Sequence, residues 1–200
     1  MLDYTIENEA ISEGYLNVCG VDEAGRGPLC GPVVAAAVIL PVGLYIEGLN
    51  DSKKLSEAKR EKIFDIIIKE ALAYAICEAS VEEINSTDIL SASLLAMRRA
   101  IASLPVSADY ALIDGNVTRG FELPCRAVVH GDALSPSIAA ASILAKVTRD
   151  RMCKDLDEQY PMYGIAKHKG YGTKVHMEAL KKYGPSPIHR TKFIRFLNED

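Results

Sequence analysis

The sequence predicts an α/β fold in which a mixed β-sheet carries helices on its faces. Short apolar runs of strand length come first in hairpin-like succession, and later runs alternate with segments of helical periodicity. This alternation favours a layered α/β arrangement. With 200 residues, 48% of them hydrophobic and 25% charged, the chain can bury a sizeable core. We therefore expect one domain over residues 1–200, with residues 1–17 as an N-terminal extension.

Five runs have the length and composition of strands. The first two are separated by the turn-rich segment Gly25-Arg26-Gly27-Pro28, which indicates two strands joined by a loop. The fourth and fifth end at or close to acidic residues. The expected strands are 18–21, 32–40, 72–80, 110–113 and 126–129.

Helices are expected where a capping residue precedes a run with helical periodicity. Ser56 and Asp88 are suitable N-caps, and Pro105 ends the second helix. Ser135, with Pro136 at the first helical position, is a strong start signal for a long helix whose alanines allow close packing against a sheet. The expected helices are 57–71, 89–104, 136–159 and 175–184.

Composition excludes several classes of protein. No run approaches the ~18 uninterrupted apolar residues of a membrane span, and the opening run MLDYTIENEAISEG is acidic, unlike a secretory signal. The five cysteines are scattered and form no C-x-x-C pair, so we interpret them as buried apolar groups. We therefore expect a cytoplasmic protein with no membrane association.

The net charge of −4 conceals a gradient along the chain. Between residues 164 and 192, seven Lys or Arg residues stand against one acid, Glu178, so this segment carries +6 and the remainder −10. Contacts to phosphates normally come from such a basic surplus. A nucleic-acid partner is therefore compatible with this acidic chain.

Four acidic residues lie where predicted strands end. Asp22 and Glu23 directly follow the first strand, Asp114 follows the fourth, and Asp132 lies just past the fifth. Ligands of such sheets bind at strand ends and the loops after them, so these acids are expected to converge. Because neighbours on a regular strand face opposite ways, Asp22 and Glu23 share a site only if the chain turns or bulges there, which Gly25 would allow.

A cluster of four carboxylates implies a metal ion. Two carboxylates ~4 Å apart repel by about 4 kcal/mol at an effective dielectric of roughly 20, so the cluster needs a compensating cation. Oxygen ligands without an H-E-x-x-H pair favour Mg²⁺ or Mn²⁺ over zinc, and a pair of such ions suits cleavage of a phosphodiester. For any one acid taken alone, the alternative is an ordinary turn or helix-cap role.

Two groups early in the chain are candidates for binding nucleic acid. Gly25 and Gly27 flank Arg26, which places a guanidinium where the backbone can approach a ligand closely. Lys53 lies in a polar loop, where it could contact phosphate. The alternatives are a tight turn for the first group and a solvated loop for the second.

Two further candidates lie later in the chain. Ser135 opens the long helix just after Asp132, so free N–H groups of the first turn could receive an anion there. Tyr171 lies between glycines in a basic loop, as do aromatic residues that contact sugars or bases. Capping by Ser135 and packing of the loop by Tyr171 are the alternatives.

Taken together, these motifs resemble the ribonuclease HII family. They occur in the order that the family shows and span about residues 18–193. The matching motifs are G-V-D-E-A-G-R-G-P at 20–28, D-S-K-K-L at 51–55, I-D-G-N at 113–116, G-D at 131–132, S-I-A-A-A-S-I-L-A-K-V-T-R-D at 137–150 and H-K-G-Y-G-T at 168–173.

The resemblance implies roles for individual residues. The four metal-binding catalytic acids of the family correspond to Asp22, Glu23, Asp114 and Asp132. The family's loop that grips the nucleotide at an RNA–DNA junction corresponds to residues 25–27. Its tyrosine beside the ribose corresponds to Tyr171, and a phosphate-contacting lysine corresponds to Lys53. The implied fold is a ribonuclease H-like mixed five-stranded sheet with flanking helices and a small helical C-terminal part, about residues 160–200, that carries Tyr171.

The resemblance also implies an activity. It implies an endonuclease that uses two Mg²⁺ or Mn²⁺ ions to hydrolyse the phosphodiester on the 5′ side of a ribonucleotide, leaving 3′-hydroxyl and 5′-phosphate ends. The implied substrates are RNA–DNA hybrids and duplex DNA with embedded ribonucleotides, which would place the protein in ribonucleotide excision repair and DNA replication. We expect a monomer, and the C-terminal run T-K-F-I-R-F-L-N-E-D leaves a sliding-clamp partner undecided because it contains no convincing clamp motif.

Some features depart from the pattern or leave alternatives open. Leu134 stands where the family often has a basic residue, and His130 where Lys or Gly is frequent, so we expect weaker phosphate contact there. The related type HIII enzymes share the acids but usually have an additional N-terminal domain and lack the G-R-G loop and this tyrosine. A binding module with structural acids and a nuclease indifferent to the 2′-hydroxyl are the competing hypotheses.

Overall fold

The computed structural model describes residues 2–198, which form a mixed five-stranded sheet. The strands are β1 Val18–Ala24, β2 Val33–Ile39, β3 Ala73–Ala79, β4 Tyr110–Asp114 and β5 Cys125–Val128. Their order in the sheet is β3-β2-β1-β4-β5. β2 is antiparallel to both β1 and β3, whereas β4 is parallel to both β1 and β5. The predicted mixed five-stranded sheet is thus confirmed.

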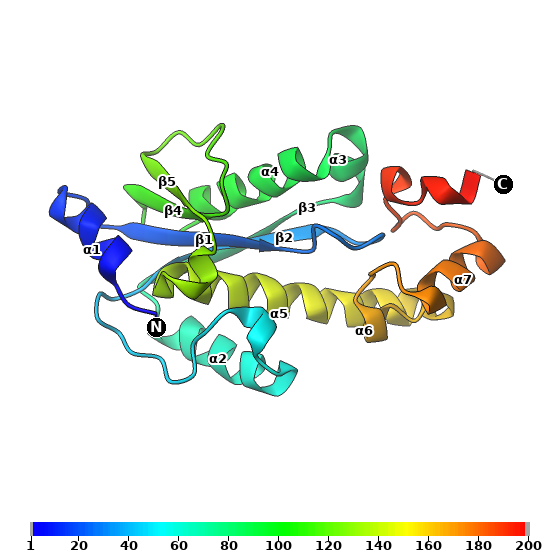
Figure 1. Ribbon diagram of the computed structural model, residues 1–200, viewed down its shortest axis with the longest axis horizontal. Coiled ribbons are helices and arrows are strands. Elements are labelled where there is room, and N and C mark those ends of the chain that lie inside the picture. The colour runs from blue at the N-terminus through cyan, green and yellow to red at the C-terminus, as the bar shows by residue number, and fades with distance from the viewer. Residues whose placement is uncertain (1, 199–200) are drawn as a thin grey trace.

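Helices cover both faces of this sheet, as predicted. They are α1 Thr5–Ser12, α2 Glu57–Glu70, α3 Val81–Ser86, α4 Ile89–Ala102, α5 Pro136–Gln159, α6 Ile165–His168 and α7 Lys174–Tyr183. Figure 1 shows α4 on one face, α5 and α2 on the other, and α6 and α7 beside the C-terminal end of α5. Within the described residues, no helix has the length and apolar character needed to cross a membrane.

The core is divided by the sheet into two layers. On one side, Val21 and Ala35 pack with α4. On the other side, Ala36 and Val38 pack with α2 and α5. β2 is buried on both faces, so its sequence is a continuous apolar run rather than an alternating one.

The long helix α5 lies directly against β1. A Cβ atom added to Gly20 would come within 2.1 Å of the carbonyl carbon of Ser137, so only glycine permits this approach. Ala139, Ala140 and Ala141 follow on the helix and are fully buried. The predicted close packing of the alanine-rich helix is therefore present, and it holds β1 in place from one side.

The structure differs from the expected elements at several ends. β1 continues to Ala24 rather than ending at residue 21, because its pairing with β2 extends to Ala24 and Val34. α4 ends at Ala102, two residues before the expected end, and Pro105 disfavours helical backbone in the residue before it. The helices α1 and α3 were not expected. α3 has a capping box formed by Ser80 and Glu83.

Candidate active site

The four predicted acids lie around the ends of β1, β4 and β5. Asp22 and Glu23 are in β1, Asp114 is the last residue of β4, and Asp132 lies in the short 3-10 helix that follows β5. The backbone N–H of Gly131 donates a hydrogen bond of 2.7 Å to Asp114 Oδ1, which ties this turn to the end of β4. Acids from three separate parts of the chain are thereby brought to one edge of the sheet.

Asp22 and Glu23 reach this edge without the turn or bulge expected from the sequence. Their register with Ala36 and Ala35 is regular, so the two side chains leave opposite faces of β1. Asp22 lies on the α5 face, near Ser142, whereas Glu23 lies on the α4 face. The backbone N–H of Glu23 donates to Asp22 Oδ1 at 2.7 Å. The two carboxylates therefore lie on opposite faces of the sheet, close to the end of β1.

Burial and repulsion by neighbouring carboxylates raise the pKa of Asp22, Glu23 and Asp132. Burial raises the pKa of Asp22 well above its usual value, and the charges of Glu23 and Asp114 raise it further. The pKa of Glu23 is raised by burial and by Asp114, although Arg26 opposes the shift. Burial also raises the pKa of Asp132, with Asp114 adding to the effect. Asp114 thus acts on each of the other three, so the cluster carries an excess of negative charge.

Two cations partly compensate this charge. Arg26 Nη1 lies 3.3 Å from Glu23 Oε1, and Lys53 Nζ lies 3.6 Å from Asp132 Oδ2. The Lys53 side chain is 80% exposed, so it lies at the mouth of the site. Burial lowers the pKa of Lys53, but the surrounding carboxylates outweigh burial and raise it. Arg26 and Lys53 therefore both lie beside the acids.

The acids fit a hard divalent cation by their chemistry. All four offer carboxylate oxygens, and burial together with the charges of neighbouring carboxylates raises the pKa of Asp22, Glu23 and Asp132. Among the described residues, no three of these acids place oxygens all within 4.8 Å of one another. This open arrangement suits Mg²⁺ or Mn²⁺, since such ions often keep waters and take further ligands from a substrate phosphate.

A cavity of about 340 Å³, the acidic cavity, joins two of the four acids, Asp22 and Glu23, to the predicted binding groups. Asp114 lines a separate, smaller cavity together with Glu23. Asp22, Glu23 and Tyr171 all line the acidic cavity. Ser142 and Lys146 of α5 also line it, although the sequence did not single them out. Their i, i+4 spacing on the helix that faces β1 is the signal that could have identified them. Lys146 also forms an ion pair of 2.7 Å with Asp150.

The glycine-flanked loop and the tyrosine lie face to face. A Cβ atom added to Gly27 would be 3.3 Å from Tyr171 Cε1, so the ring packs over this glycine. Gly25 has a φ of 101°, a conformation that other residues rarely adopt. Half of the Tyr171 side chain remains exposed, which leaves it available to a ligand. The loop and the ring thus form one surface next to the acids.

Two buried arginines support this surface, and the sequence did not identify either. Arg149 donates to the carbonyls of Cys30 and Lys169, at 3.2 and 3.0 Å. Arg190 is fully buried and donates to five carbonyls between Gly25 and Pro32. An arginine in a helical or C-terminal run is usually exposed, so the sequence carries no direct signal for this role.

Ser135 does not face the cavity. Its side chain is fully buried, donates to Glu7 at 2.6 Å and accepts from the backbone N–H of Ile138 at 3.1 Å. The Ser135 side chain is therefore a helix cap, as the alternative describes, and a contact between the first turn of α5 and substrate stays a prediction. Leu134 and His130, the two departures from the family pattern, are exposed close to Asp132.

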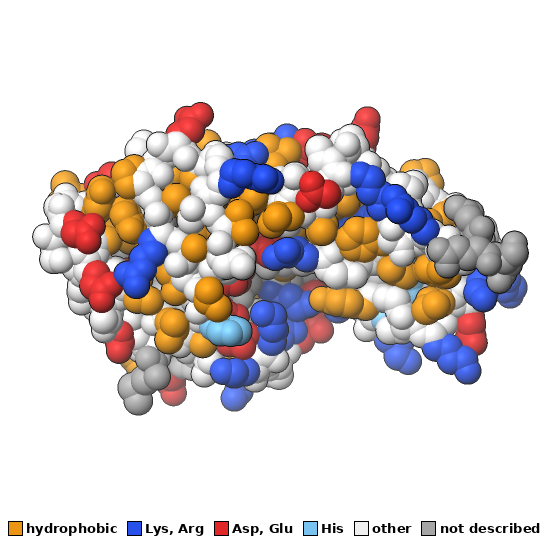
Figure 2. Space-filling view, turned by 45° about the horizontal axis from the view of Figure 1, so that its top comes forward, with side chains coloured by type: hydrophobic (Ala, Val, Ile, Leu, Met, Phe, Trp, Pro, Cys, Tyr) orange, Lys and Arg blue, Asp and Glu red, His pale blue; other side chains and the backbone are white. Residues whose placement is uncertain are grey.

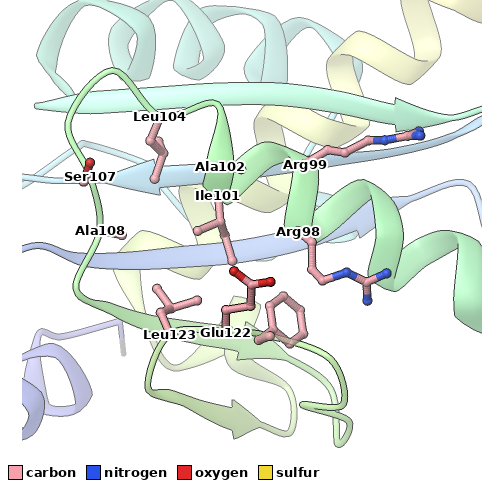
Figure 3. A pocket seen from close by; sticks show the side chains of 10 residues that line it. Arg98, Arg99, Ile101, Ala102, Leu104, Ser107, Ala108, Glu122 and Leu123 are labelled. Atoms are coloured by element: carbon pink, nitrogen blue, oxygen red, sulfur yellow. The ribbon is translucent and has the colours of Figure 1, made fainter.

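Another cavity, of about 470 Å³, lies away from the acids. It is formed between the end of α4 and the loop before β5, where Leu104, Phe121 and Leu123 line it (Figure 3). Arg98 and Glu122 also line it. Its lining contains two arginines and a single acid, which does not provide a metal site, so the acidic cavity is the stronger candidate for catalysis.

The surface near the acidic cavity carries basic side chains. Figure 2 shows Lys and Arg residues beside the hollow that separates the sheet from the C-terminal part. The predicted basic segment, residues 164–192, contains α6 and α7 on the C-terminal side of this hollow. A negatively charged polymer would therefore meet positive charge on its way to the acids.

Comparisons with known proteins agree with this geometry. The family model for ribonuclease HII matches residues 19–196. A ribonuclease HII of Burkholderia pseudomallei is 58% identical over 176 residues, covering 88% of this chain and 82% of its own. The ribonuclease H2 structure from Pyrococcus horikoshii has a TM-score of 0.75 at 30% identity, covering 92% and 98% of the two chains. The RNase HII solved with PCNA from Archaeoglobus fulgidus has a TM-score of 0.69 at 27% identity, covering 92% and 95%.

Proposed function

The chain belongs to the ribonuclease HII family and is a ribonuclease H endonuclease, and from this premise we propose its substrate and products. It hydrolyses the phosphodiester on the 5′ side of a ribonucleotide, in RNA–DNA hybrids and at single ribonucleotides in duplex DNA. The products are 3′-hydroxyl and 5′-phosphate ends. The observation that supports this most is one cavity lined by Asp22, the glycine-flanked loop and Tyr171.

Asp22, Glu23, Asp114 and Asp132 are proposed to hold Mg²⁺ or Mn²⁺. Bound divalent ions supply the positive charge that activates water and stabilises a leaving oxygen. The carboxylates themselves provide hard oxygen ligands at a strand edge where their own repulsion favours cation binding. Lys53 is proposed to move from Asp132 to a substrate phosphate, which its exposure permits.

Recognition of the ribonucleotide is proposed to come from the surface formed by residues 25–27 and Tyr171. Because these glycines have no side chains, the sugar-phosphate backbone can approach their peptide groups closely. The Tyr171 ring, packed over Gly27, is proposed to lie against the ribose, where the 2′-hydroxyl distinguishes RNA from DNA. Lys146 lines the same cavity and is proposed to contact a phosphate.

A cleavage assay tests this function. A duplex with one embedded ribonucleotide and an otherwise identical all-DNA duplex are incubated with the protein and Mg²⁺, Mn²⁺ or chelator. We expect metal-dependent cleavage of the first duplex and far slower cleavage of the second. Equal cleavage of both would favour a nuclease indifferent to the 2′-hydroxyl, and salt-dependent binding without cleavage would favour a binding module.

The variant Asp114→Asn tests the role of the acids. We expect a loss of activity by about two to three orders of magnitude, the scale of removing one preorganised contact of a transition state. Asp65→Asn, on the exposed side of α2, is the matched control and keeps full activity. Thermal unfolding establishes that both variants are folded. Cleavage by Asp114→Asn at the wild-type rate would overturn the proposed site.

A further inference from the structure

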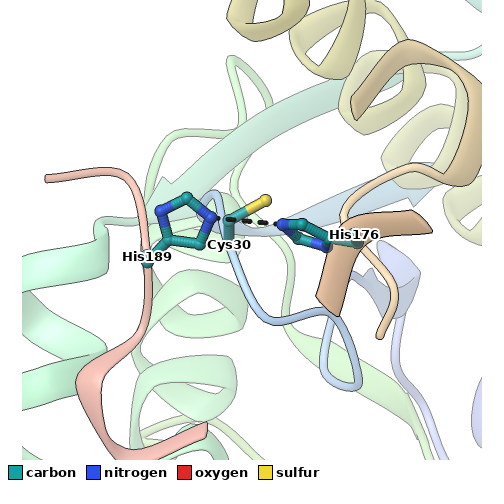
Figure 4. Close-up of side chains that lie close together, drawn as sticks. All are labelled: Cys30, His176 and His189. Carbon is teal, nitrogen blue, oxygen red and sulfur yellow. Dashed lines mark hydrogen bonds between the residues drawn. The ribbon is translucent and has the colours of Figure 1, made fainter. Parts of the chain in front are cut away.

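Two buried histidines connect the C-terminal segment to residues 169–173, the loop that carries Tyr171. His176 lies in the first turn of α7, whereas His189 lies beyond α7 and forms an isolated β-bridge with Cys30. Neither histidine is more than 2% exposed. Their Nε2 atoms lie 3.2 Å apart (Figure 4), and Nδ1 of His176 lies 3.0 Å from the carbonyl oxygen of Tyr171. The two rings therefore form a hydrogen-bonded path that ends on the backbone of Tyr171.

The direction of each hydrogen bond in this path follows from its far end. The backbone N–H of Ser186 lies 3.1 Å from Nδ1 of His189 and can only donate, so this nitrogen accepts and the ring proton is on Nε2. That proton is donated to Nε2 of His176, whose own proton is then on Nδ1. His176 therefore donates to the Tyr171 carbonyl, and each imidazole is neutral with a partner at both nitrogens.

An added proton would break the hydrogen-bonded path. An imidazolium has an N–H at both nitrogens, so a proton on His176 would set two N–H groups against each other across 3.2 Å, and one on His189 would oppose the N–H of Ser186. Burial lowers the pKa of His176 and lowers that of His189 to about 4, so the path is intact near neutral pH. The titratable and charged groups packed around the two rings and the adjoining cysteine include no carboxylate that would stabilise an imidazolium; they are His168, Tyr163, Cys30, Arg149 and Arg190.

The backbone of this loop is unfavourable by itself and depends on such anchors. Lys169 has a φ of 53° and Gly170 a φ of 81°, so two successive residues before Tyr171 have left-handed backbone, which a lysine rarely adopts. The Tyr171 carbonyl also accepts from the N–H of Thr173 at 2.8 Å, a contact within the loop. The donor that ties this carbonyl to a helix is therefore His176.

We propose that His176 and His189 are positioning residues for recognition of the ribonucleotide, because they hold the backbone of Tyr171 so that its ring stays over Gly27. This inference rests on the proposed contact between Tyr171 and the ribose. The Tyr171 side chain is 48% exposed, so packing alone restrains its ring little, and the position of the ring follows that of the backbone. Neither histidine is among the residues that line the acidic cavity, so both act through Tyr171.

Substitution of His176 tests this role through the selectivity of cleavage. His176→Phe keeps a buried ring but removes the donor to Tyr171. We expect the ratio of kcat/KM values for embedded-ribonucleotide and all-DNA duplexes to fall by about three- to tenfold, the range that the loss of one hydrogen bond produces. His176→Asn, whose side-chain amide donates from about the position of Nδ1, should recover most of that ratio. His168→Phe makes the same change in the ring stacked on His176 and is the control, with an unchanged ratio.

A double variant separates failure of this inference from failure of the proposed function. In a Tyr171→Ala background, His176→Phe should change the ratio no further, because the ring that it positions is absent. A ratio unaffected by Tyr171→Ala would contradict the proposed ribose contact itself. A ratio that falls in Tyr171→Ala but not in a folded His176→Phe, or that falls further in the double variant, would overturn the positioning role alone.

Nitrogen NMR of the wild type tests the hydrogen-bonded path independently of how any variant folds. The chain has four histidines, so a spectrum of the ¹⁵N-labelled protein contains few imidazole signals to assign. At pH 7 with Mg²⁺ present, we expect His176 with its proton on Nδ1 and His189 with its proton on Nε2. The opposite tautomer of either ring, or a charged ring at this pH, would overturn the path.

Discussion

The guanidinium of Arg190 donates a hydrogen bond of 2.7 Å to the carbonyl of Gly25, a residue 165 positions earlier in the chain. The same side chain donates to Arg26 and Pro28 at 3.0 and 2.8 Å. One buried cation from the C-terminal part therefore satisfies several carbonyls of the loop that follows β1. That loop lines the acidic cavity, so the shape of the cavity depends on Arg190, although Arg190 does not line it.

Arg190→Met should disrupt both stability and substrate binding. The substitution leaves several buried carbonyls without a donor, at about 1–3 kcal/mol for each group that stays unpaired. We expect the free energy of unfolding, measured by urea denaturation, to fall by at least about 3 kcal/mol. The KM for a duplex with one ribonucleotide should rise as the loop loosens. Arg195→Met, an exposed arginine of the same segment, is the control, and an Arg190→Met enzyme indistinguishable from it would contradict the assignment.

The strands of the sheet and the position of the acids at strand ends could be predicted from the sequence because both follow from local patterns. Apolar runs identify strands directly, and a carboxylate just after such a run is conspicuous. The hydrogen bonds by which Arg149 and Arg190 support the loop after β1 could not be predicted from the sequence. Their acceptors are backbone carbonyls far away in the chain, so no pattern in the neighbouring residues indicates them. The helix α1 was missed because Tyr4 provides no side-chain cap; Glu7 of that helix instead accepts a hydrogen bond from Ser135.

Tyr171→Ala should reduce selectivity for ribonucleotides without destabilising the protein. Half of the side chain is exposed, so its removal leaves little buried space, whereas the ring over Gly27 is the proposed contact to the ribose. We expect the ratio of kcat/KM values for embedded-ribonucleotide and all-DNA duplexes to fall by about tenfold, corresponding to the roughly 1–3 kcal/mol of one aromatic contact with a nucleotide. Tyr183→Ala, equally exposed on α7, is the control. An unchanged ratio for Tyr171→Ala would assign the ring to packing alone.

Gly20→Ala should destabilise the fold strongly. The added Cβ would lie 2.1 Å from the backbone of Ser137, and neither α5 nor β1 can move without disturbing both cores. We expect the free energy of unfolding to fall by about 3 kcal/mol or more, above the usual 1–3 kcal/mol for overpacking. Gly172→Ala is the control, because its Cβ would meet only the end of the Leu29 side chain at 3.3 Å. Similar unfolding midpoints for the two variants would contradict the close contact between β1 and α5.

Without divalent ions, the acidic cluster should make stability fall as pH rises. Burial raises the native pKa of Asp22, Glu23 and Asp132, so the native state holds these protons more tightly than the unfolded state does. The stability they contribute is present below the unfolded pKa values, near pH 4, and is lost as pH rises through the native values. In chelator, the midpoint of thermal unfolding should therefore decrease above about pH 4, and Mg²⁺ should restore it by binding the native state.

Asp22→Asn separates this electrostatic cost from the need for metal. The amide removes a buried charge, so in chelator at pH 7 we expect a higher unfolding midpoint than in wild type and a weaker dependence on pH, although cleavage is lost. A native pKa one unit above the unfolded value costs the ionised protein about 1.4 kcal/mol, which is measurable in the midpoint. Asp65→Asn, an exposed acid, should leave both quantities unchanged. The two apolar cores, and not an ion, supply most of the burial, so unfolding in chelator should stay cooperative. An unfolding midpoint for Asp22→Asn below that of the wild type would show instead that the ionised carboxylate stabilises the fold.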